Sequence, residues 1–194
     1  MEKQPEYAPI FFKQAKYTLL DQNTFWLCEK PDSVGMVGWD AALTRIATWV
    51  KLQDKKTGQI LMVVNTHFDH IGTEARRNSA LLIIEKIKEI VGTSPAILTG
   101  DFNVSEDWDA YKTITNNEFI LKDAHKVAGK RTGVDFTYHN FGKIPAEKCE
   151  KIDFIFVTPQ IRVISSYIPF SQLNDTLFLS DHNPEIVELE IEKS

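Results

Sequence analysis

Apolar and polar residues along the first third of this chain alternate or cluster as they do in β-strands. The pattern predicts strands at 10–13, 17–20, 24–28, 42–52 and 60–64. The polar residues 21–23 suggest a turn between two of them, and 55–59 suggests a hairpin turn between the last two. The continuous apolar run 60–64 is typical of a strand buried on both faces.

The clearest helix falls at 73–91, where apolar side chains recur on one helical face. Thr73 can cap its start and Gly92 can end it. Farther along, the pattern predicts a short helix near 107–115, an irregular stretch at 122–150, and strands at 95–100, 119–121, 152–157, 161–168 and 185–191. A strand-rich chain with one long helix predicts an α/β fold of mixed sheets with helices packed outside.

The composition narrows the function classes without choosing one. A length of 194 residues fits a single domain over 1–194, and the net charge of -5 offers no broad basic face, so a nucleic-acid partner is possible but not favoured. Cys28 and Cys149 are too few for a disulfide framework or a zinc site and fit buried small hydrophobes. No apolar run is long enough for a transmembrane segment, and no signal-peptide pattern begins the chain. We therefore expect a soluble protein, cytoplasmic by default, while a secretion signal on a longer parent stays open.

Polar side chains follow or interrupt the apolar runs at several places. Asp101 and Asn103 come directly after the strand at 95–100, and strand alternation should send both to one side, where they could hold a water and a phosphoryl oxygen. Asp153 lies within an apolar strand and needs a partner if it is buried. His182 is a candidate for that partner and for a general acid or base, because its ordinary pKa lies near neutrality. A carboxylate beside it would orient the ring and stabilise its charged form.

Each of these residues also has a purely structural explanation. The Gly-Asp-x-Asn sequence around Asp101 is a good turn, and residues 181–184 could form a capped loop. Asp153 could be an edge-strand acid that faces solvent. The convergence of several such residues at strand ends favours one shared site and metal-assisted hydrolysis.

Histidines and arginines near the other strands add candidates for binding phosphate. His67 follows a buried strand, and we favour a role as hydrogen-bond donor to phosphate over a structural role. For His70 the two roles are nearly equally favoured. Arg45, inside an apolar strand, and Arg76, at the helix start, could bind phosphate or a site carboxylate. For Arg76 a structural or surface salt bridge is the default.

Taken in chain order, four motifs resemble those of the endonuclease/exonuclease/phosphatase superfamily, which has the deoxyribonuclease I-like fold. They are Asn65-Thr66-His67, Gly100-Asp101-Phe102-Asn103, Ile152-Asp153-Phe154-Ile155 and Ser180-Asp181-His182. The stretches 38–49 and 65–76 also look like a largely uncharacterised bacterial branch of it.

The resemblance implies a two-sheet α/β sandwich with the site at one end. His182 would be general base or phosphate stabiliser, oriented by Asp153, and His67 would bind the scissile phosphate. Asp101 and Asn103 would position the attacking water and a phosphate oxygen. Asp181 would contact a divalent metal, Mg²⁺ or Mn²⁺, directly or through water.

One departure from the family pattern concerns the start of the domain. Members normally begin with a strand that bears an Asn, then a helix and a strand that ends in a metal-binding Glu, and nothing before Tyr7 supplies these elements. The resemblance therefore implies a sandwich that is incomplete at the N-terminus. It also implies an exposed sheet edge at which a partner or a swapped segment could complete the fold.

We therefore expect a metal-dependent phosphoester hydrolase, most simply of phosphodiesters. The alternative is a catalytically impaired fragment or a remnant that binds a phosphorylated ligand or partner without turning it over. A serine hydrolase built on Ser180 is disfavoured, because adjacent Ser-Asp-His side chains do not fold into a relay. Small phosphodiesters, nucleotides, sugar or inositol phosphates and lipid head groups all stay open as substrates.

Overall fold

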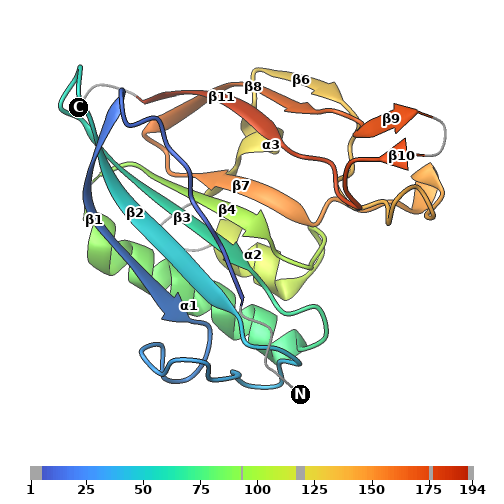
Figure 1. The fold of residues 1–194 in the computed structure, drawn as a ribbon, viewed down its shortest axis with the longest axis horizontal. Helices are drawn as coiled ribbons and strands as arrows, with labels where there is room; N and C mark the ends of the chain where they lie inside the picture. Colours follow the sequence, from blue (N-terminus) through green and yellow to red (C-terminus); the bar gives the residue numbers. More distant parts are fainter. Residues whose placement is uncertain (1–5, 93, 117–120, 175–176, 192–194) are drawn as a thin grey trace.

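The computed structural model describes residues 6–92, 94–116, 121–174 and 177–191 (Figure 1). Its elements are β1 (Tyr17–Trp26), β2 (Ile46–Asp54), β3 (Ile60–His67), α1 (Thr73–Val91), β4 (Ala96–Asp101), α2 (Asp109–Thr115), β5 (Lys122–Asp123), α3 (Ala124–Val127), β6 (Lys130–Gly133), a 3₁₀ turn η1 (Ala146–Lys148), β7 (Asp153–Val157), β8 (Ile161–Ile168), β9 (Gln172–Asn174), β10 (Leu177–Phe178) and β11 (Ile186–Ile191).

Two sheets face one another. The larger has the order β1-β2-β3-β4-β7-β5, and the smaller has the order β11-β8-β6. Within the larger sheet only β3 and β4 pair in parallel, because α1 carries the chain back between them. Strands β9 and β10 form a small separate ribbon that projects from the end of the smaller sheet (Figure 1). The predicted two-sheet α/β fold is confirmed.

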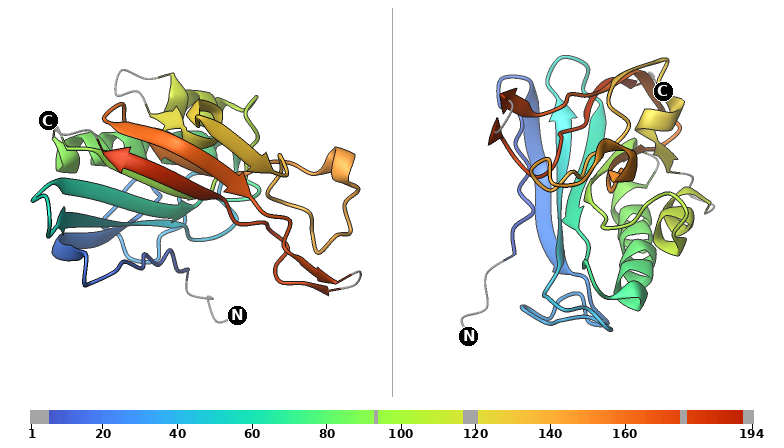
Figure 2. Two further views of the ribbon diagram at one scale, coloured as in Figure 1. Left: turned by 90° about the horizontal axis from the view of Figure 1, so that it is seen from above. Right: turned by 90° about the vertical axis from the view of Figure 1, so that its right-hand side faces the viewer.

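Two apolar cores hold these layers together. The first lies between the larger sheet and the helices, where α1 presents Ala80, Ile83, Ile84 and Ile87 to Met62, Val64, Leu98 and Phe102. The second lies between the two sheets and contains Leu61, Val157, Ile161 and Val163. Figure 2 shows α1 and α2 on one face of the larger sheet and the smaller sheet on the other. The apolar run of β3 is explained by this position, since both of its faces are covered.

The sequence pattern located the periodic elements correctly. Helix α1 has the predicted bounds, and Gly92 ends it in a backbone conformation of φ 58° that favours glycine. The strands predicted at 95–100, 152–157, 161–168 and 185–191 correspond to β4, β7, β8 and β11 within one residue at each end. Long alternating or apolar runs carry enough signal to survive the tertiary context.

The prediction for the first strands was right only in part: residues 17–20 and 24–26 are strand, but they belong to one element. Residues 10–13 form no strand, and 21–23 are not a turn but part of the single ten-residue strand β1. This strand lies at the edge of the sheet and is mostly exposed, so polar residues cost it little. Its pairing with β2 shifts between Leu19 and Asp21, which marks a bulge near the polar residues.

Two further predictions need correction. Thr73 does not cap α1; the carboxylate of Asp40, from a distant loop, accepts hydrogen bonds from the backbone N–H groups of Glu74 (3.2 Å) and Ala75 (2.7 Å). The stretch 122–150 is not irregular throughout, because it contains β5, α3, β6 and η1, which are too short to show a period. Of the strand predicted at 119–121, residues 119 and 120 lie outside the described residues.

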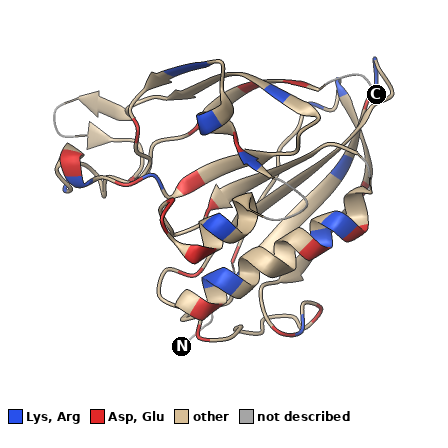
Figure 3. Cartoon of the chain, turned by 180° about the vertical axis from the view of Figure 1, so that it is seen from behind, with Lys and Arg blue, Asp and Glu red and all other residues tan. Residues whose placement is uncertain are grey.

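The surface carries charges of both signs. Figure 3 shows Lys and Arg interspersed with Asp and Glu along α1 and over the neighbouring strands. Among the described residues, no helix combines the length and the apolar character that a membrane crossing requires.

Candidate active site

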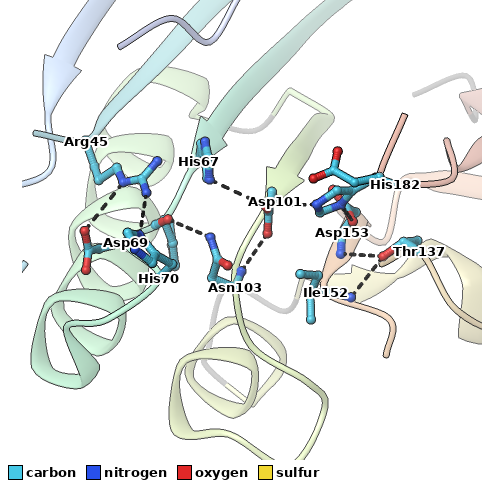
Figure 4. Close-up of polar contacts among 12 residues, drawn as sticks. Arg45, His67, Asp69, His70, Asp101, Asn103, Thr137, Ile152, Asp153 and His182 are labelled. Carbon is cyan, nitrogen blue, oxygen red and sulfur yellow. Dashed lines mark hydrogen bonds and ion pairs between the residues drawn. The ribbon is translucent and has the colours of Figure 1, made fainter. Parts of the chain in front are cut away.

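Sheet register brings the predicted chemical groups into one row (Figure 4). His67 ends β3 and Asp101 ends β4, and the parallel pairing of these strands sets the two residues opposite each other. Asp153 begins β7, whose antiparallel pairing sets it opposite Asp101 on the other side. His182 follows in the loop before β11 and reaches the same point. Three strands and one loop therefore place these side chains around Asp101.

A close approach of backbones makes this register possible. Gly100 has φ +155°, and a Cβ atom there would collide with the carbonyl oxygen of Thr66 on β3. Only glycine allows β4 to lie this close to β3 immediately before Asp101. The glycine in the Gly-Asp-x-Asn motif thus allows the close strand pairing that positions the carboxylate of Asp101.

Asp153 and His182 form a hydrogen-bonded pair. The Nδ1 atom of His182 lies 2.7 Å from Oδ2 of Asp153. The backbone N–H of Asp153 donates to Oγ1 of Thr137 (3.1 Å), which fixes the strand beneath the carboxylate. Burial opposes charge on His182, but the hydrogen bond and the charge of Asp153, with Asp101 adding to them, raise its pKa above the ordinary value. The prediction that these two residues meet is confirmed.

Asp101 lies at the centre of the row, where its surroundings disfavour the charged form of its carboxyl group. Burial, together with the nearby charge of Asp153, raises its pKa to about 6, although the backbone N–H of Asn103 donates to its Oδ1 at 2.8 Å. Asp101, Asp153 and His182 each offer a ligand atom, and these atoms lie within 4.8 Å of one another. Two carboxylates with an imidazole form a donor set that fits a divalent cation such as Mg²⁺ or Mn²⁺, and a positive charge there would relieve the repulsion between the acids.

On the other side of Asp101, His67 lies between two carboxylates and close enough to Arg45 to feel its charge. Its Nε2 atom is 3.5 Å from Oδ2 of Asp101, and its Nδ1 atom is 3.2 Å from Oε1 of Glu6. Burial and the charge of Arg45 lower the pKa of His67 to about 4. At neutral pH His67 is therefore a neutral imidazole that can donate one hydrogen bond and accept another.

Arg45 is buried and is held by three neighbours. Its guanidinium contacts Oε1 of Glu6 (3.4 Å), Nδ1 of His70 (3.2 Å) and Oδ2 of Asp69 (3.7 Å). Arg45 and His70 thus lie beside His67, at the left of the row in Figure 4. Glu6 was missed by the sequence analysis, because no pattern surrounds it and its partners are far away in sequence.

Arg76 does not join this group. It is buried, donates to the backbone oxygen of Asp69 (2.9 Å) and lies over the ring of Trp108 (4.9 Å to the centroid). Burial works against the charged form of Asp69, but the backbone N–H groups of Gly72 and Ile71 lower its pKa to about 2. Arg76 and Asp69 therefore stabilise the loop that follows His67 and carries His70.

Asn103 and Asp181 flank the central acids. Asn103 has φ 49°, outside the strand conformation, so strand alternation does not set its side chain as predicted; its Nδ2 donates to the backbone oxygen of Phe68 (3.0 Å). Oδ1 of Asp181 accepts a hydrogen bond from Ser180 (3.3 Å), and Asp181 is not one of the three clustered metal donors. Its predicted contact with a metal stays a prediction.

The row opens onto a cavity of about 440 Å³ between the larger sheet and the start of β11. Its walls include His67, Asp101 and Asp153, together with Tyr7, Asn65 and Glu185. A second cavity, of about 650 Å³, lies between the starts of α1 and α2 and is lined by Arg76 and Trp108, with none of the clustered donors. The chemistry therefore belongs to the smaller cavity.

Comparison with known proteins gives the class of this protein. The profile of the Endonuclease/Exonuclease/phosphatase family matches residues 10–182. The chain belongs to this family, whose members include nucleases and phosphatases.

Solved structures and a curated relative agree with that assignment. The endonuclease/exonuclease/phosphatase from Bacteroides vulgatus is 64% identical, with a TM-score of 0.90 over 93% of this chain and 69% of that one. The mannosyl-6-phosphatase Bt3783 of Bacteroides thetaiotaomicron is 34% identical, with a TM-score of 0.84 over 93% of this chain and 69% of that one. The uncharacterized protein L388 of Acanthamoeba polyphaga mimivirus is 30% identical over 85% of this chain, which spans 63% of that relative's length.

Proposed function

We propose that this chain carries the active site of a divalent-metal-dependent phosphoester hydrolase. The observation that supports this most directly is the convergence of Asp101, Asp153 and His182 within 4.8 Å, with both acids in the wall of one cavity. Water attacks the phosphorus of the substrate in line with the leaving oxygen, and the P–O bond to the leaving group breaks.

Each residue of the row has a proposed task. Asp153 holds the ring of His182 through Nδ1, which leaves Nε2 to donate to a phosphoryl oxygen or to exchange a proton with water. Asp101 positions the attacking water, and Asn103 offers its amide to a phosphate oxygen. His67, neutral at physiological pH, donates to the scissile phosphate without adding a charge.

The residues also fit the cation that we propose. Carboxylate oxygens of Asp101 and Asp153 suit Mg²⁺ or Mn²⁺, and we propose that Asp181 contacts it directly or through water. When bound, such a cation polarises the phosphoryl oxygen and offsets the charge that develops during hydrolysis. The guanidinium of Arg45 supplies a positive charge beside His67 and donates to Nδ1 of His70 (3.2 Å), and we propose that both residues support phosphate binding. For Arg76 we propose only an indirect part, through the loop that it stabilises.

Phosphodiesters are the substrate class that we propose first, and phosphorylated sugars are the second. The second rests on the likeness to a relative described as a mannosyl-6-phosphatase, at 34% identity. A nucleic-acid substrate is less favoured, because the net charge is -5 and both signs are interspersed on the surface.

The decisive assay compares three substrates with and without Mg²⁺ or Mn²⁺. These are bis-p-nitrophenyl phosphate, p-nitrophenyl phosphate and mannose 6-phosphate, each tested on the wild type and on His182→Ala. Metal-dependent turnover that disappears in the variant supports the proposal, and the preferred substrate decides between diester and sugar monoester. Absence of turnover on all three by a folded chain would favour a non-catalytic phosphate-binding protein instead.

A completing segment or partner is also proposed. Among the described strands, β11 is the outer strand of the smaller sheet: it pairs with β8 along one of its edges, and no described strand pairs with its other edge. Val187, Leu189 and Ile191 on β11 are only partly buried against the second core. An added strand along the free edge of β11 would cover these side chains.

A further inference from the structure

A buried ion pair, Lys151–Glu185, contacts the backbone of Asp153, the partner of His182. Nζ of Lys151 is 2.9 Å from Oε2 of Glu185, and the two side chains are only 7% and 3% exposed. Removing both charges from water is expensive, and an apolar pair of similar size is often at least as stable. Stability alone therefore does not explain this pair.

The position of the pair relates it to the site. Lys151 precedes Asp153 by two residues, and Glu185 follows His182 by three. Besides contacting Glu185, Nζ of Lys151 donates to the backbone oxygen of Asp153 at 2.8 Å. One ammonium group thus joins the segment that carries the carboxylate to the segment that carries the imidazole.

Both ends of the pair are anchored to rigid elements. Nζ of Lys151 lies 3.9 Å from the centroid of the Phe154 ring, which belongs to the first core. Oε1 of Glu185 accepts a hydrogen bond from Ser166 on β8 (3.2 Å), and Ser166 in turn contacts Nδ1 of His125 (2.8 Å). The chain of contacts runs from the larger sheet to the smaller one, so it fixes the distance between them at the site.

We propose that Lys151 and Glu185 are positioning residues that hold Asp153 and His182 in register across the two sheets. The catalytic consequence rests on the proposed phosphoester hydrolysis, whereas the structural one does not. Glu185 lines the cavity, but its carboxylate contacts Lys151 and Ser166, and Nζ of Lys151 contacts Glu185 and the backbone oxygen of Asp153. They act through the backbone of Asp153, because a small displacement there lengthens the 2.7 Å hydrogen bond to His182.

The test uses the double variant Lys151→Met/Glu185→Leu, which replaces the pair with apolar side chains of similar size. Its control is Arg162→Met/Glu190→Leu, which removes an exposed ion pair between β8 and β11 by the same two kinds of substitution. Two quantities are measured in each: the NMR resonance of the His182 Nδ1 proton, which needs no substrate, and kcat and KM on bis-p-nitrophenyl phosphate with Mg²⁺.

We expect the buried double variant to fold, its Nδ1 proton resonance to move upfield and broaden, and kcat to fall about 10- to 100-fold while KM changes little. The control should match the wild type in all three. A folded double variant with an unmoved resonance overturns the proposal, whatever its activity. If the wild type itself hydrolyses no phosphoester, the proposed function fails but the resonance still decides the positioning role.

Should the double variant fail to fold, Glu185→Gln answers the same question. It retains the shape of the side chain and removes its charge, so the attachment of Lys151 weakens without a cavity. The same displacement of the His182 resonance is expected, and an unmoved resonance again counts against the proposal.

Discussion

His67 and His182 lie on opposite sides of Asp101, and their pKa values are shifted in opposite directions. His182 faces the carboxylate of Asp153, and its pKa is raised despite burial. Burial lowers the pKa of His67 to about 4, with the charge of buried Arg45 acting in the same direction. The comparison teaches that the same side chain can serve one site both as a group that gains charge easily and as a donor that is neutral near pH 7, because burial and neighbouring charges set its pKa.

The largest expected effect comes from removing the chargeable histidine. His182→Ala should lower kcat/KM for a phosphoester by about 1000-fold or more, because it removes the imidazole that is hydrogen-bonded to Asp153 and has a raised pKa. Steady-state kinetics at saturating Mg²⁺ measure this. His67→Ala serves as the comparison and should lose far less; equal losses would mean that the two histidines do not differ in function.

A smaller loss is expected when His182 keeps its ring but loses its charged partner. Asp153→Asn should lower kcat by about 100-fold and lower the pKa of His182, because the amide no longer stabilises the imidazolium. Activity assays and a ¹H–¹⁵N NMR titration of the metal-free protein measure the two effects. A His182 pKa that stayed at or above its wild-type value would show that Asp153 does not set it.

On the His67 side, the carboxylate of Glu6 lies between His67 and Arg45, where we place part of the phosphate site. Glu6→Gln removes a negative charge that repels phosphate, so it should tighten the binding of inorganic phosphate by about threefold to tenfold. Isothermal titration calorimetry measures the dissociation constant. Glu74→Gln, on the exposed start of α1, is the control and should leave it unchanged. Weaker binding by Glu6→Gln would instead assign Glu6 to orienting Arg45 and His67.

The smallest effect concerns the pH dependence of folding in the metal-free protein. The pKa of His67 is lower when folded, so between pH 6.5 and about 4 the unfolded chain binds the extra proton and acid favours unfolding. His182 has the opposite sign: its raised pKa stabilises the fold at low pH, and this contribution is lost as pH rises through the folded pKa. We therefore expect wild type to lose stability relative to His67→Gln as pH falls over that range. Urea unfolding at several pH values checks this, and a difference that is constant with pH would contradict the assigned pKa.

Much of the fold was predictable because its signals are local. The helical period placed α1, and apolar runs placed β3, β4 and β7, each without knowledge of a neighbour. The polar edge strand β1 was misjudged, because its exposure follows from having no strand beyond it in the sheet. Asp40 was not foreseen as the cap of α1, because it lies more than 30 residues before the helix turn that it caps.

For the site, residue types and strand ends identified Asp101, Asp153 and His182, and the resemblance ordered them by role. Glu6 and the Lys151–Glu185 pair were not found, since a Lys or Glu near an apolar run carries no sign of its partner. The sequence by itself determined which chemistry the chain can offer and where β4 and β7, which carry the two central acids, lie along the chain. Only the tertiary structure decided which groups meet and which histidine is charged, because strand register and burial arise from contacts between segments that are far apart in sequence.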